Sequence, residues 1–254
     1  LLQGATFEIY DKAQNVVDTV VSNERGLAIS KLLPLGRYTI KETKAPNYYG
    51  VSGETFEAEI EFASQIVRLE VLDESVYTNV VIGKSGPKQV TPGMQMKWTI
   101  SRVANNSSIR LTSFYWRDNL PYQAVQLDKI VTGTYNTRLN YQITYKTNYN
   151  DYRVLATNLL STNNYAFDLS AISLMQDEVV TDVRLEFGKV PAGFASVVKP
   201  TVTIQTSANL ANGYQVVNRA DAGGQYMSQW ETGRAAWITL IVKLNQPNLP
   251  KTGY

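Results

Sequence analysis

Short segments in which apolar and polar residues alternate run along most of the chain, and Gly, Pro, Asn and Asp separate them. These segments are rich in Thr, Tyr, Val and Ile, which favour strands. The clearest are ATFEIYD, GRYTIKE, TFEAEIEF, IVRLEVL, MQMKWTIS, YQITYKT, VRLEFG, TVTIQT and AWITLIVK. Helical periodicity is weak, and only LSAISLMQDE, residues 169–178, fits one or two helical turns. The pattern predicts an all-β fold of two tandem Ig-like β-sandwich domains with little helix.

A change in this pattern near residue 80 predicts a domain boundary. Before it, a compact set of strands ends in SVYTNVV, and after it the Gly/Pro-punctuated stretch GKSGPKQVTPG leads into a new series of strands. The chain ends in QPNLPKTGY, whose two prolines fit neither a helix interior nor a central strand. We therefore expect a first domain over residues 1–80, a larger second domain over 81–247 and a tail over 248–254.

Composition narrows the classes of partner and chemistry. Lys and Arg number 24 against 22 Asp and Glu, a net charge of +2 without a basic cluster, so nucleic acid is not an expected partner. The chain contains neither Cys nor His, which excludes disulfides, thiolate nucleophiles, Ser-His-Asp triads and the usual zinc sites. We expect no metal site and no cofactor. Carboxylates, lysines, tyrosines and hydroxyls remain for chemistry.

The first domain carries a specific pattern of residues. LLQGATFEIYD is followed by VVSNERGLAISKLLPLGRYTIKETKAPNYY, which combines Leu-x-Gly-Ala-x-Phe, a Gly-containing turn, Leu-x-x-Gly-x-Tyr and Glu-x-x-Ala-Pro in order. This pattern resembles the collagen-adhesin B-type (Cna-B) domain of Gram-positive surface proteins and pilins. The resemblance covers roughly residues 1 to 80.

Glu42 is the candidate functional residue of this domain. Strand alternation places Tyr38, Ile40 and Glu42 on one largely apolar face, where a carboxyl should have a raised pKa. The resemblance implies that Glu42 promotes an amide bond between a Lys on the first strand and an Asn on the last, for which Asn79 is the best match. The corresponding Lys would lie upstream of Leu1, so no bond is assigned within this domain. The alternative is a protonated Glu42 held by ordinary hydrogen bonds.

Near its start the second domain contains GKSGPKQVTPGMQMKWTISRVANNSSIRLTSFYWRDNLP, which has a Lys-x-x-x-Pro entry, a Pro-Gly turn and a final Asp-x-Leu-Pro, and it later contains YQVVNRADAGG. These motifs resemble, more loosely, the repeated sandwich domains of Gram-positive surface proteins, including those of the A type. The resemblance implies an internal Lys-to-Asn amide bond assisted by an Asp. Lys84 lies in register with Val80 and Ile82, and Asp118 ends the strand SFYWRD. Asn245, at the end of the last strand, is the expected source of the carboxamide, and it requires a bulge because alternation places it opposite its strand's apolar residues. Asn218 is the alternative. The alternatives are a solvated linker lysine at 84 and a turn aspartate at 118.

The tail carries the last motif. Leu249, Pro250, Thr252 and Gly253, with Lys251 at the variable position, match the sortase sorting signal Leu-Pro-x-Thr-Gly. The resemblance implies that sortase cleaves between Thr252 and Gly253 and transfers the Thr252 acyl group to an amine of a peptidoglycan precursor or of another pilin subunit. The expected location is then outside the cell, attached covalently to the cell wall or to a pilus.

Three functions fit these observations. The leading one is a sortase-anchored pilin subunit or adhesin that is not an enzyme, apart from forming its own amide bonds. The second is a passive stalk of a larger adhesin. The third is a module in the second domain that binds a carbohydrate or a host matrix protein, because residues 136–152 interleave Tyr with Arg and Lys.

Overall fold

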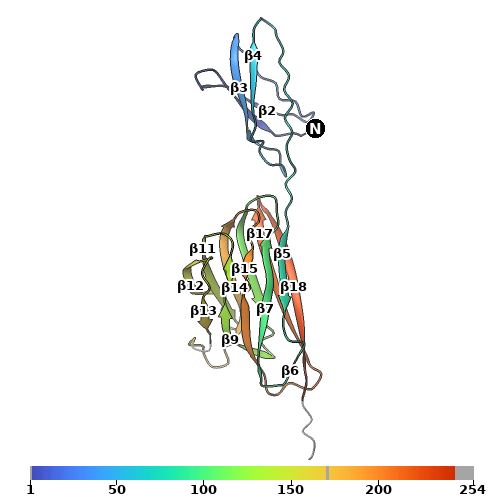
Figure 1. The fold of residues 1–254 in the computed structure, drawn as a ribbon, viewed down its shortest axis with the longest axis vertical. Coiled ribbons are helices and arrows are strands. Elements are labelled where there is room, and N and C mark those ends of the chain that lie inside the picture. The colour runs from blue at the N-terminus through green and yellow to red at the C-terminus, as the bar shows by residue number, and fades with distance from the viewer. Residues whose placement is uncertain (1, 170–171, 244–254) are drawn as a thin grey trace, which may run out of the picture. The chain divides into compact units, whose positions relative to one another are not determined.

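The computed structural model describes residues 2–169 and 172–243, and all regular structure in these residues is β-strand (Figure 1). The prediction of an all-β chain is therefore confirmed. The chain divides into two compact units, Leu1–Tyr77 and Thr78–Tyr254. The division lies beside the boundary expected near residue 80.

The first unit is built on one antiparallel four-stranded sheet in the order β2-β1-β3-β4. Its strands are β1 (Thr6–Tyr10), β2 (Val16–Val21), β3 (Gly36–Lys44) and β4 (Thr55–Ile60). The turn between β1 and β2 is fixed by Asp11, whose carboxylate accepts a hydrogen bond from the backbone N–H of Asn15 at 2.9 Å. Few apolar side chains of this unit are fully buried; they are Ala5, Ile9, Tyr38 and Ala45.

Residues 66–72, IVRLEVL, were expected to form a strand and do not. The apolar residues at the two ends of the segment face solvent, Ile66 at 79% exposure and Leu72 at 80%. Alternation alone does not make a strand, because each strand also needs a neighbour for its backbone hydrogen bonds.

The second unit is a β-sandwich with a seven-stranded and a five-stranded sheet, together with a two-stranded β10-β15 ribbon. The seven-stranded sheet has the order β12-β11-β14-β8-β17-β18-β6, and the five-stranded sheet has the order β13-β9-β16-β7-β5. In chain order the strands are β5 (Val80–Ser85), β6 (Gln89–Val90), β7 (Gln95–Asn105), β8 (Leu111–Asn119), β9 (Val125–Val131), β10 (Thr134–Tyr135), β11 (Asn140–Thr147), β12 (Arg153–Leu160), β13 (Ala166–Asp168), β14 (Val180–Val190), β15 (Ser196–Val198), β16 (Thr201–Thr206), β17 (Gln215–Tyr226) and β18 (Gln229–Ile241).

The core of this unit follows from the period of two along each strand. On β8 the fully buried residues Phe114, Trp116 and Asp118 alternate with partly exposed ones. Fully buried Trp98 and Ile100 alternate in the same way on β7. One polar group, Asp118, therefore lies on a face that is otherwise apolar.

Residues 169–178 were the only segment that fitted a helix, and the described part, residues 169 and 172–178, forms bends and a turn. Asp177 takes a positive φ of 61°. The Glu178 carboxylate accepts hydrogen bonds from the Met175 backbone N–H at 2.9 Å and from the Thr147 hydroxyl at 2.7 Å. Side-chain hydrogen bonds thus stabilise this segment in place of the backbone hydrogen bonds that a helix would form.

Candidate functional site

Lys84 lies on β5 and points into the second unit. Val80, Ile82 and Lys84 are the buried positions of this strand, as the alternation predicts. The Lys84 side chain is completely shielded from solvent, and its Nζ lies 5.5 Å from the centre of the Trp98 ring. A lysine in such a position needs a partner, because burial of an isolated ammonium is very costly.

Asp118 supplies that partner from the opposite sheet. Its Oδ2 lies 2.6 Å from Lys84 Nζ, and its side chain is also fully shielded from solvent. Burial raises the pKa of Asp118, and this effect exceeds the lowering caused by Lys84 and Asn218 beside it. The pair therefore joins β5 of the five-stranded sheet to β8 of the seven-stranded sheet.

Asn218 is the third member of this cluster. On β17, Ala220 is paired with Asp118, and Asn218 lies two residues along on the same inward face. The residue is fully buried, yet neither atom of its carboxamide makes a hydrogen bond within the described residues, and Asp118 Oδ1 also has none. Such groups are rare in native proteins, and each costs about 1–3 kcal/mol. A lysine, an acid and an unsatisfied carboxamide thus meet in an apolar interior.

The packing around this cluster depends on Gly86, which the sequence did not single out. A Cβ at Gly86 would come within 2.5 Å of Cδ1 of Trp98 and within 3.3 Å of the Trp237 ring. Gly86 therefore allows Trp98 to lie against the backbone, beside Lys84. The Gly/Pro punctuation of residues 83–93 could have indicated a close approach of this kind.

Asn245 and the residues of the predicted sorting motif, 249–253, lie outside the described residues. Of the two carboxamides considered for the second domain, the structure therefore describes only Asn218. The structure brings together Lys84, Asp118 and Asn218. This is one of the two combinations predicted from the sequence.

Glu42 lies in the first unit on β3 and is 5% exposed. Its Oε2 accepts a hydrogen bond from the backbone N–H of Ser52 at 2.5 Å, whereas its Oε1 and the Asp73 Oδ1 make none within the described residues. Burial raises the pKa of Glu42 most, the Ser52 N–H lowers it, and Asp73 raises it further. The sequence did not single out Asp73, which stands in no regular strand.

Asn79 falls in the second unit. Its backbone carbonyl accepts a hydrogen bond from the backbone N–H of Asn106 at 2.8 Å, and its own N–H donates to the Ser107 hydroxyl at 2.9 Å. Glu42 and Asn79 thus belong to separate units.

The residues that the structure describes contain neither a cluster of metal ligands nor a membrane-crossing helix. Among them, no group of three or more Asp or Glu side chains is arranged to hold a metal ion. No helix that could cross a membrane occurs in the same residues.

Known proteins resemble the two parts of the chain to different degrees. Residues 1–75 match the family model "SpaA: Prealbumin-like fold domain". The trypsin-resistant surface T6 protein of Streptococcus pyogenes serotype M6 is 37% identical over 79 residues, which are 31% of this chain and 15% of that protein. The chain therefore spans a small part of this relative, which is a surface protein.

Solved structures that resemble most of the chain include pilins of low sequence identity. The major pilin subunit BcpA of Bacillus cereus is 13% identical with a TM-score of 0.34, covering 94% of this chain and 65% of the pilin. The full-length major pilin SpaD of Corynebacterium diphtheriae is 18% identical with a TM-score of 0.35, covering 94% and 59%. At TM-scores this low, structural likeness does not identify the function of the second unit.

Residues 1–75 therefore resemble a prealbumin-like SpaA domain, and the chain shares a segment of 79 residues with a streptococcal surface protein. This conclusion rests on the family model that matches residues 1–75 and on the streptococcal relative.

Proposed function

We propose that the chain is part of a sortase-anchored pilin subunit or adhesin whose second unit is closed by an amide bond between Lys84 and Asn218. The observation that carries this proposal is the buried contact of 2.6 Å between Lys84 and Asp118, beside a carboxamide without hydrogen bonds. Solvated linker and turn residues, the alternatives for Lys84 and Asp118, would be exposed. Both side chains are instead fully shielded.

The chemistry requires a neutral amine, a carboxamide and a buried acid. Burial raises the pKa of Asp118, which favours the protonated acid that the reaction needs. The Lys84 Nζ attacks Cγ of Asn218 while Asp118 donates its proton to the carbonyl oxygen, which stabilises the tetrahedral intermediate. A proton from the attacking nitrogen then passes through Asp118 to Nδ2 of Asn218. As the intermediate collapses, the bond between Cγ and Nδ2 breaks and ammonia leaves, while the oxygen returns its proton to Asp118 and the carbonyl of the new amide forms.

The position of this bond suits a protein under tension. β5 is the first strand of the second unit, and it lies in a different sheet from β17. A covalent link between the two sheets would resist their separation, and it would restrict the unfolded chain as a disulfide does without needing cysteine. An extracellular shaft or stalk is the setting in which such a link is useful.

Intact mass and peptide mapping test the bond. The wild-type chain should be lighter than its sequence mass by one ammonia, and the map should contain a peptide in which Lys84 is joined to Asn218. Asn218→Ala should restore the sequence mass, whereas the matched variant Asn245→Ala should keep the deficit. A folded wild type with an unmodified Lys84 would refute the proposal, and loss of the deficit in Asn245→Ala alone would refute Asn218 as the partner.

A further inference from the structure

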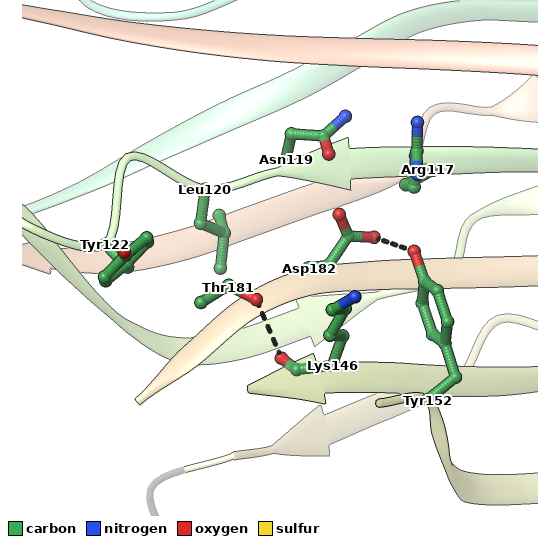
Figure 2. Close-up of a pocket in the computed structure, with 8 residues that line it drawn as sticks. All are labelled: Arg117, Asn119, Leu120, Tyr122, Lys146, Tyr152, Thr181 and Asp182. Carbon is green, nitrogen blue, oxygen red and sulfur yellow. Dashed lines mark hydrogen bonds between the residues drawn. The ribbon is translucent and has the colours of Figure 1, made fainter. Parts of the chain in front are cut away.

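A second site lies on the outward face of the seven-stranded sheet. A pocket of about 370 Å³ opens there between β8, β14 and β11, close to the start of β12 (Figure 2). Its volume falls in the range of small-molecule sites, about 300–1,000 Å³. Asp118, at the crosslink, points inward from β8, whereas its neighbours Arg117 and Asn119 line the pocket on the other side of the strand.

Asp182 is the central polar group of this pocket. It is 6% exposed, and its Oδ1 accepts a hydrogen bond from the Tyr152 hydroxyl at 2.6 Å. Figure 2 shows its other oxygen on the side of Asn119. Burial raises the pKa of Asp182 to about 7, so that near neutral pH its carboxyl can both accept and donate hydrogen bonds.

Asp221 lies outside the pocket and holds the side chains of Arg117 and Asn119 in position. Its Oδ1 accepts hydrogen bonds from Arg117 Nε at 2.9 Å and from Asn119 Nδ2 at 3.0 Å. These bonds leave the amide oxygen of Asn119 on the side of Asp182, as Figure 2 shows. The pocket therefore presents donors and acceptors that are held in place before any ligand binds.

Two tyrosines flank these polar groups. Tyr122 is 39% exposed, and in Figure 2 it lies on the opposite side of Asp182 from Tyr152. Aromatic rings with a polar tip bind ligands that have both apolar faces and hydroxyl edges. Buried Leu120 adds an apolar surface between them.

The charges of the pocket are largely balanced. Arg117 is paired with Asp221 at 2.9 Å, and Lys146 is paired with Asp151 at 3.3 Å. Because each cation already has an acidic partner, the pocket offers no excess of positive charge to a phosphate or a polyanion. Its recognition groups instead match a ligand that carries many hydroxyl groups and no net charge.

We propose that this pocket binds a neutral saccharide ring, with Tyr122 as the stacking surface and Arg117, Asn119 and Asp182 as hydrogen-bonding partners. The site is independent of the amide bond between Lys84 and Asn218. It would give the second unit a recognition function in addition to its structural one.

The test is saturation-transfer NMR on the full chain with separate sugars at millimolar concentration. The neutral probes are glucose, galactose, mannose, N-acetylglucosamine and lactose, and N-acetylneuraminic acid is the charged probe. We expect transfer to at least one neutral probe, with affinity lowered at least tenfold in Tyr122→Ala and in Asn119→Ala. Tyr214→Ala is the matched control, since Tyr214 is 42% exposed and lies outside the pocket. Thermal scans confirm that each variant is folded.

Three results would overturn the proposal. The first is the absence of transfer to every neutral probe, and the second is transfer to N-acetylneuraminic acid alone. The third is transfer to a neutral probe that survives both pocket substitutions, because the sugar would then bind elsewhere. None of these results bears on the amide bond, which the mass measurement tests separately.

Discussion

Nζ of Lys84 and Oδ2 of Asp118 lie 2.6 Å apart, and neither side chain is exposed to solvent. A buried ion pair of this kind is a weak source of stability, because desolvation offsets most of the attraction. Conversion of the lysine into an amide changes this balance. The amide carries no charge, and burial raises the pKa of Asp118, which favours its protonated form. The contact therefore contributes little net stability as an ion pair, which agrees with the reaction proposed for Lys84 and Asn218.

Replacement of Asp118 by Asn should keep the shape of the site and remove the proton shuttle. We expect the intact mass of Asp118→Asn to match its sequence, without the loss of one ammonia. The variant should also unfold at lower temperature, because the unfolded chain regains the freedom of the loop between residues 84 and 218. By analogy with a disulfide, the loss is on the order of 5 kcal/mol, or roughly 10–20 °C.

Asn218→Ala provides the matched control for this result, since it also prevents the bond but leaves the Lys84–Asp118 contact in place. In the Asn218→Ala background, Asp118→Asn should produce no further change in crosslinking. An ammonia deficit that persists in Asp118→Asn would show that Asp118 is not required for the reaction.

Much of this site could be predicted from the sequence, because alternation along a strand fixes which side chains share a face. Val80 and Ile82 place Lys84 inward, and the structure confirms this. The choice between Asn218 and Asn245 could not be made in the same way. A bulge reverses the parity of a strand, and nothing in a single sequence reveals which strand contains one.

Features that depend on the pairing of several strands could not be predicted from the sequence. IVRLEVL alternates as a strand should, but no neighbouring strand pairs with it. The pocket on the outward face combines Arg117 of β8, Lys146 of β11 and Asp182 of β14, which become neighbours only through the order of the sheet. Residue patterns along the chain carry no information about such pairings.

Gly86→Ala should destabilise the second unit and disturb the crosslink. The new Cβ would lie 2.5 Å from the Trp98 ring, so Trp98 must move, and Trp98 packs beside Lys84. Overpacking of this kind costs about 1–3 kcal/mol, which lowers the melting temperature by roughly 2–12 °C. The amide bond should also form more slowly, as followed by mass over time after refolding.

Gly53→Ala is the control for this substitution, because a Cβ at Gly53 would meet nothing within 4 Å. Its melting temperature should stay close to that of the wild type. If both substitutions lower the melting temperature equally, the contact with Trp98 is not what restricts the size of the side chain at position 86.

The sorting motif leads to a prediction about processing. Purified sortase with an amine donor should release Gly253-Tyr254 and join the donor to Thr252, as detected by intact mass. Thr252→Ala changes one of the fixed positions of Leu-Pro-x-Thr-Gly and should block the reaction. If the mass of the wild type stays unchanged while a control peptide is processed, the chain is not a substrate of that sortase.

Asp182→Asn should change how stability depends on pH. The pKa of Asp182 is raised from an ordinary value of 3.8 to about 7 by burial, while the Tyr152 hydroxyl and Arg117 lower it and Asp221 and Asp118 raise it. Between these two values the folded state binds more protons than the unfolded state, so this group makes the protein less stable as pH rises.

The asparagine cannot titrate and therefore removes this contribution. We expect Asp182→Asn to gain melting temperature relative to the wild type as pH rises from about 4 to about 7, and to keep that gain at higher pH. The full effect is at most about 4 kcal/mol, which corresponds to a shift of three pH units. Asp128→Asn, on β9 of the other sheet, is the control. A change in Asp182→Asn that is no larger than the change in Asp128→Asn would not be specific to the surroundings of Asp182, and parallel melting curves for wild type and Asp182→Asn across this range would contradict the prediction outright.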